Sequence, residues 1–209
     1  MTEAHIRQWQ GALGIAQDGD FGPTTLAKSM ALIAASPQIA PERPASAPGT
    51  SSAYPREADM TAFYGPRAGP DCTAGVVNLP MKFVIAWDIS EKVTSFRCHA
   101  KLAAPITEIF RQAFNHYGEG GMRDLGLNIF GGCYSPRKKR GSTTAWSIHS
   151  WGAAVDLDTD NNTLRMDHTE ASFARKEYLP FWAIVEANGA TSLGRARDFD
   201  WQHFQFARL

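Results

Sequence analysis

Cysteine is scarce in this sequence, which excludes one common way of holding a fold together. Only three cysteines, Cys72, Cys98 and Cys133, occur in 209 residues, and none of them belongs to a C-x-x-C motif. An odd and sparse set is not a disulfide framework, and it is not a strong zinc site either. We therefore expect three unbridged thiols that are partly buried as small apolar groups.

Net charge and long apolar runs are also missing. Lys and Arg number 21, as do Asp and Glu, so the formal net charge is zero. No electrostatic argument then favours nucleic acid or an anionic membrane, and no apolar run is long enough to cross a bilayer. The start, MTEAHIRQWQGALGI, has no basic region followed by a continuous apolar stretch. We expect no nucleic-acid partner, no membrane insertion and no signal peptide.

Proline is present but unevenly distributed. Residues 36–57, SPQIAPERPASAPGTSSAYPRE, hold five of the twelve prolines and show no hydrophobic period. Such a segment predicts an extended linker rather than a packed element. It separates a short N-terminal module, residues 1–35, from a domain of ordinary size, residues 58–209.

The N-terminal module, residues 1–35, has the pattern of two short helices. Apolar residues in AHIRQWQGALGI recur at helical spacing, a turn follows at Asp18–Gly19, and Pro23 suits the first turn of a second helix. Leu26, Met30 and Ile33 continue the apolar stripe. With RQWQGALGI and DGDFGPTTLAKSM, the module resembles the peptidoglycan-binding domain of cell-wall hydrolases. That resemblance implies attachment to peptidoglycan; the alternative is a helical hairpin that only stabilises the fold.

The larger domain, residues 58–209, alternates helix-like and strand-like patterns. HAKLAAPITEIFRQAFNHYG has one apolar face and predicts a long amphipathic helix. YLPFWAIVEANGA predicts a helix that begins near Pro180 and ends at Asn188 and Gly189. GLNIFGGCY and HFQFARL predict short strands. We expect an α+β domain in which helices flank a small, antiparallel sheet.

Two histidines and one aspartate stand where strands would turn them away from the core. In AAVDLD, a period of two places Asp156 opposite Val155 and Leu157. In HFQF, His203 lies opposite the two phenylalanines, and His149 precedes the first strand. Two imidazole nitrogens and one carboxylate oxygen form a good catalytic zinc shell with a fourth position open to water. The same donors also suit non-haem iron, which metal analysis would distinguish.

A carboxylate beside the metal-bound water would complete this chemistry. Bound zinc lowers the pKa of water to about 7, and a nearby carboxylate can take the proton and pass it to a leaving amine. Asp200 comes three residues before His203 and lies close to it if DFDWQH turns before the strand. Asp198 competes for the same role.

The patterns SxHxxGxAxD and DxxHFQ, with the preceding GGCYSPRKKRGSTTAW, resemble one family. It comprises the zinc peptidases that include VanY-type D-alanyl-D-alanine carboxypeptidases and the L-alanyl-D-glutamate endopeptidases of bacteriophage lysins. The resemblance spans roughly residues 63–206. It implies the fold of zinc D,D-peptidases and one Zn2+ per chain, held by His149, Asp156 and His203, with Asp200 as the catalytic carboxylate.

The family also has an arginine that grips a substrate carboxylate, and Arg137 is its best positional match. The planar fork of arginine suits this task because it offers two parallel hydrogen bonds. Arg140, Lys138 and Lys139 are rivals, and a solvated loop is the simpler alternative. Ser147 matches a family serine that orients substrate near the metal.

The resemblance as a whole implies a peptidoglycan hydrolase of the phage or prophage endolysin type. We expect a monomer that waits in the bacterial cytoplasm, is released to the wall, and cleaves a stem-peptide bond, L-alanyl-D-glutamate. The lysin branch of the family has aspartate at the position of Asp200, which favours a lysin over a VanY-type enzyme. Two alternatives stay open: a D-alanyl-D-alanine carboxypeptidase of the same fold, and a non-catalytic cell-wall-binding or phage structural protein.

Overall fold

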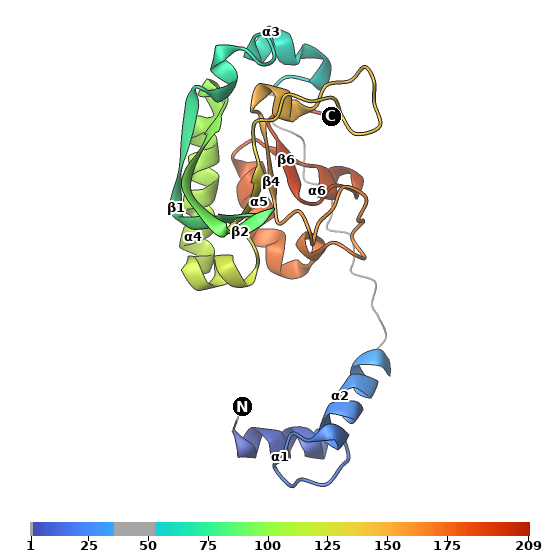
Figure 1. Cartoon of the computed structure of the whole chain (residues 1–209). Helices are drawn as coiled ribbons and strands as arrows, with labels where there is room; N and C mark the ends of the chain where they lie inside the picture. The colour runs from blue at the N-terminus through green and yellow to red at the C-terminus, as the bar shows by residue number, and fades with distance from the viewer. Residues whose placement is uncertain (1, 36–52) are drawn as a thin grey trace. The chain divides into compact units, whose positions relative to one another are not determined.

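A computed structural model describes residues 2–35 and 53–209. The chain forms two compact units, Met1–Ala40 and Pro41–Leu209 (Figure 1). Most of the predicted linker, residues 36–52, lies outside the described residues.

The first unit contains the two predicted helices, α1 (Glu3–Ala12) and α2 (Pro23–Ala35). Its centre is polar, because Gln10 is only 1% exposed. The Gln10 amide nitrogen donates to Asp20 O at 2.9 Å and to Thr25 Oγ1 at 3.0 Å, while its oxygen accepts from Gly19 N at 2.9 Å. One buried amide thus holds the turn between the two helices and satisfies its backbone groups.

The predicted apolar stripe of this unit is only partly buried: Ile6 and Leu13 are half-buried, and three other members are exposed. Trp9 is 38% exposed, Leu26 49% and Met30 62%, and the side chain of Ile33 lies outside the described part. A unit this small has too little interior to cover large apolar side chains. Several of them are left on its surface.

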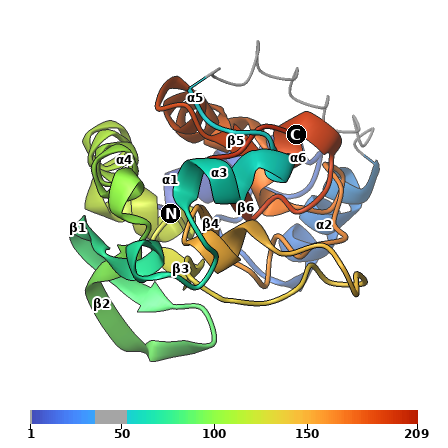
Figure 2. The same ribbon diagram turned by 90° about the horizontal axis from the view of Figure 1, so that it is seen from above.

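The second unit is α+β and contains a six-stranded, mostly antiparallel sheet with flanking helices (Figures 1 and 2), as predicted in outline. The strand order is β2-β1-β3-β4-β6-β5, and β1 and β3 run parallel. The long hairpin of the first two strands was not among the predicted elements. The strands are β1 (Gly75–Ile85), β2 (Asp88–Cys98), β3 (Ile129–Gly132), β4 (Ala154–Leu157), β5 (Thr191–Ser192) and β6 (His203–Gln205).

Helices cover the sheet much as the apolar patterns predict. The longest helix, α4 (Ala103–Asp124), buries its apolar face, and Phe110 meets Phe83 of β1 edge to face at 5.2 Å. The helix α5 (Leu179–Ala187) has Pro180 in its first turn and ends at Asn188. Both predictions are confirmed. Residues 53–209 also contain the α-helices α3 (Met60–Tyr64) and α6 (Leu193–Arg197).

The last residues of the predicted linker pack against the C-terminal segment of the second unit. The Tyr54 ring lies 5.0 Å from the Phe206 ring in an edge-to-face contact. Arg208 N donates to Pro55 O at 2.7 Å, and Glu57 N donates to Arg208 O at 3.3 Å. The prediction of an extended linker up to residue 57 is therefore wrong at its C-terminal end. Residues 54–57 belong to the packed second unit, because they make aromatic and backbone contacts with it.

All three cysteines are free and buried, as expected. Burial raises the pKa of Cys98 to about 12, and burial also holds the pKa of Cys133 well above its usual value. These thiols therefore act as small core groups. Among the helices of residues 2–35 and 53–209, none is both long and apolar enough to cross a bilayer.

Candidate metal centre

Neighbouring strands bring two of the predicted ligands together. β4 and β6 pair antiparallel, and their register places Asp156 directly opposite His203. Val155 and Leu157 on the other face of β4 are fully buried in the core. The alternation predicted for both strands is confirmed, and it leaves the two ligands on the same face of the sheet.

A short 3-10 turn, Ile148–Trp151, brings in the third ligand. It ends at Gly152, whose φ of 62° is left-handed, and a Cβ there would lie 2.2 Å from Cys72 O. Only glycine meets both conditions without strain. The chain can therefore turn sharply from His149 into β4, and His149 lies beside Asp156.

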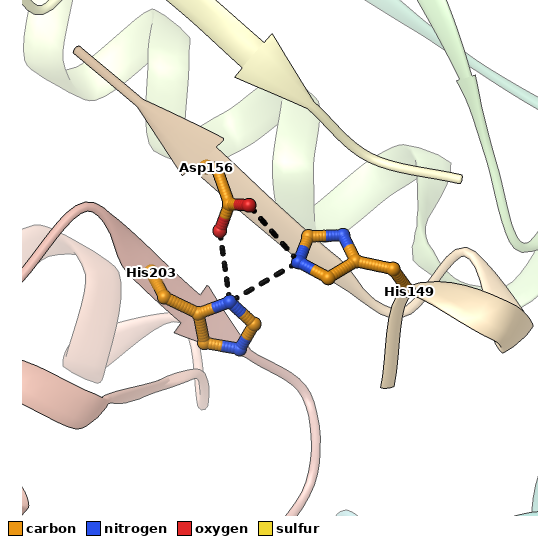
Figure 3. A group of neighbouring side chains, drawn as sticks. All are labelled: His149, Asp156 and His203. Atoms are coloured by element: carbon orange, nitrogen blue, oxygen red, sulfur yellow. Dashed lines mark hydrogen bonds and ion pairs between the residues drawn. The ribbon is translucent and has the colours of Figure 1, made fainter. Parts of the chain in front are cut away.

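The three side chains form one compact cluster (Figure 3). His203 Nδ1 lies 2.8 Å from Asp156 Oδ1, and His149 Nε2 lies 3.2 Å from Asp156 Oδ2. The two imidazole nitrogens are 3.2 Å apart. One ligand atom from each residue falls within 4.8 Å of the others, so the group could hold a metal ion.

Electrostatics inside the cluster favour a cation. Burial alone would raise the pKa of Asp156, but the charges and hydrogen bonds of His149 and His203 outweigh it and lower that pKa. Burial would lower the pKa of His203, but its hydrogen bond to Asp156 and the charge of that carboxylate raise it. Asp156 therefore stays ionised between the two imidazoles, and a metal ion bound there would replace the proton that His203 shares with it.

The orientation of His149 is set by a backbone group. Its Nδ1 lies 2.7 Å from Cys133 O. A carbonyl can only accept, so Nδ1 carries a proton, and Nε2, which faces Asp156, is the nitrogen left for a metal ion. This partner was not predictable from the sequence, since every residue has a carbonyl and no side-chain pattern marks the one that is used.

Asp200 lies in a turn just before β6. Its φ is 55°, its carbonyl accepts from His203 N at 3.0 Å, and its side chain is buried, with Oδ1 accepting from Gln202 Nε2 at 2.8 Å. Burial raises the pKa of Asp200, and the negative charge of Asp156 adds to this effect. A carboxyl group with a raised pKa is suited to take up and release a proton.

Asp198, the competing carboxylate, is engaged elsewhere. Its Oδ2 lies 2.6 Å from His168 Nδ1. Its Oδ1 accepts from His168 N at 2.7 Å and from Trp201 Nε1 at 3.3 Å. Both oxygens therefore stabilise a loop, and the geometry favours Asp200 as the proton carrier.

The four consecutive basic residues separate into different environments. Lys138 Nζ lies 3.9 Å from the centre of the Trp146 ring, and Lys139 pairs with Glu57. The side chain of Arg137 is exposed. The fourth residue, Arg140, lines a cavity of about 500 Å3 together with Gly141, Thr163, Leu164 and Arg165.

The cavity beside Arg140 is joined to the candidate centre through the backbone. Leu164 O accepts from Asp200 N at 3.1 Å. Arg140 therefore stays a rival of Arg137 as the residue that would meet a substrate carboxylate. Ser147, the predicted substrate-orienting residue, is buried at the start of the turn that carries His149 and donates its backbone N–H to Arg137 O at 3.0 Å.

No family model, no curated protein and no solved structure matches this chain.

Proposed function

We propose that this protein is a zinc metallopeptidase that hydrolyses the L-alanyl-D-glutamate bond in the stem peptide of bacterial peptidoglycan. The observation that carries the proposal is the buried cluster of His149, Asp156 and His203, with ligand atoms within 4.8 Å of one another. Two imidazoles and one carboxylate suit a catalytic zinc with one open position. The substrate class comes from the resemblance of the sequence motifs to lysin peptidases.

Each residue then has a separate task. When bound, zinc would supply Lewis acidity toward the scissile carbonyl and lower the pKa of a bound water to about 7. Asp200 would take a proton from the attacking water and deliver it to the departing amine. Arg140 or Arg137 would hold a carboxylate of the stem peptide through paired hydrogen bonds.

Product analysis tests this proposal directly. Purified peptidoglycan would be digested with the full chain and examined by mass spectrometry, with and without a chelator, alongside elemental analysis of the protein. We expect one zinc per chain and chelator-sensitive release of a new amino terminus on D-glutamate. Free D-alanine would identify a carboxypeptidase instead, and no product with zinc bound would indicate a non-catalytic wall-binding protein.

We propose that the first unit attaches the enzyme to the wall. The exposed side chains of Trp9, Leu26 and Met30 support this role, because apolar and aromatic surface is suited to contact with glycan rings. Attachment would raise the local concentration of the second unit at its substrate. Such a protein would be an endolysin that reaches the wall after release from the cytoplasm.

Two truncations separate attachment from folding. A variant that begins at Ala53 should hydrolyse soluble muropeptides at the rate of the full chain but lose activity on intact walls. A variant that begins at Ala58 also lacks the contacts of Tyr54, Pro55 and Glu57 with the C-terminal segment. Arg208 Nε also donates to Tyr54 O at 2.8 Å. Three hydrogen bonds and one aromatic pair at about 1 kcal/mol each predict about 4 kcal/mol of lost stability.

Thermal unfolding and turnover on both substrates measure these effects. The shorter variant should unfold roughly 8–16 °C below the variant that begins at Ala53. Unchanged activity on intact walls without residues 1–52 would show that the first unit is not a wall-binding module.

A further inference from the structure

Gln205 occupies a constrained position beside the cluster. It lies on β6, two residues after His203, and its backbone pairs with Ala154 of β4 on one side and Thr191 of β5 on the other. The side chain is 1% exposed. Its position relative to His203 is therefore set by the sheet rather than by a mobile loop.

The amide of Gln205 can be oriented from its partners. Its Nε2 donates to Ala207 O at 3.2 Å, and its Oε1 lies 3.1 Å from His203 Nε2. Because a carbonyl oxygen cannot donate, the NH2 group must face Ala207. The remaining amide oxygen faces His203 and can only accept.

We propose that Gln205 is a positioning residue that makes His203 bind metal through Nδ1. An oxygen that only accepts requires a proton of His203 on Nε2. Nδ1 faces Asp156 Oδ1 at 2.8 Å, so the proton on Nδ1 is the one that a metal ion would replace. This inference rests on the proposed metal centre and does not depend on which bond is cleaved. It adds a neutral amide to the partners that orient the ligands.

The two histidines present different ring nitrogens to the cluster. His149 donates through Nδ1 to Cys133 O and presents Nε2, whereas His203 donates through Nε2 to Gln205 and presents Nδ1. The difference follows from their elements. A ligand on a turn can reach a neighbouring backbone carbonyl, whereas His203 on the paired strand β6 finds its acceptor in the side chain two residues further along the same face.

Three variants of the full chain test the proposal. Gln205→Met keeps the length of the side chain but removes the acceptor, and we expect zinc affinity to fall by about 10–100-fold, as is usual for loss of an outer partner. Gln205→Glu retains an acceptor and should restore affinity to within a few-fold of the wild type. Gln202→Met changes another buried glutamine, whose amide contacts Asp200 rather than a histidine, and should leave zinc affinity unchanged.

Two readouts are needed, because a loss of affinity alone can follow from misfolding. Zinc affinity would be measured by competition with a chromophoric chelator. Nitrogen-15 NMR of the zinc-loaded wild type should show His203 protonated at Nε2 and metal-shifted at Nδ1. Unchanged zinc affinity in folded Gln205→Met, equal losses in the Met and Glu variants, or coordination through Nε2 would each overturn the proposal.

These outcomes are distinct from failure of the proposed function. A wild type that binds zinc with the expected dependence on Gln205 but releases no peptidoglycan fragment would refute the peptidase and support the positioning role. If Gln205→Met does not fold, the nitrogen assignment in the wild type and the zinc affinity of Gln205→Glu still decide the matter.

Discussion

His203→Ala is expected to abolish zinc retention and hydrolysis together. The substitution removes one of three ligand atoms and leaves Asp156, whose Oδ1 lies 2.8 Å from His203 Nδ1, with one imidazole instead of two. Loss of an outer partner costs about 10–100-fold in metal affinity, so loss of a ligand should exceed 100-fold. His149→Ala should have the same effect, since it supplies another nitrogen of the same cluster.

Metal content by elemental analysis and turnover of soluble muropeptides measure both losses. His168→Ala is a matched control, because His168 also pairs with a carboxylate, Asp198, but lies outside the cluster. It should retain one zinc per chain. A His203→Ala protein that keeps stoichiometric zinc and full turnover would contradict the proposed centre.

Asp200→Asn is expected to retain zinc but to lose turnover by about 10²–10⁴-fold, the usual contribution of a general acid–base group. The substitution is nearly isosteric, and the asparagine oxygen can still accept from Gln202 Nε2. Asparagine also tolerates the left-handed backbone at this position, where φ is 55°. The loss should therefore come from chemistry and not from unfolding.

The comparison with Asp198→Asn makes this test specific. Asp198 holds His168 at 2.6 Å, so its replacement should lower thermal stability and leave most turnover intact. Turnover on soluble muropeptides, zinc content and melting temperature would be measured for both variants. An active Asp200→Asn beside an inactive Asp198→Asn would exchange the roles assigned to the two carboxylates.

Regular elements were predictable where local periodicity carries the information. The apolar face of α4, the start of α5 at Pro180 and the alternation in β4 are confirmed, because each depends on neighbours within a few residues. The polar centre of the first unit was not predictable in this way. Gln10 is buried because the turn wraps around its amide, and no apolar period marks such a position.

The ligand types and the faces on which they lie could be inferred from the chain alone, since side-chain chemistry and a period of two are local properties. The sequence alone did not show that the three ligands lie together, because His203 is 47 residues from Asp156 and 54 from His149. The register of β4 against β6 sets the distance between Asp156 and His203. The choice between Asp200 and Asp198, and the nitrogen that each histidine presents, depend on partners brought together only by packing. These partners include His168, the carbonyl of Cys133 and the buried amide of Gln205.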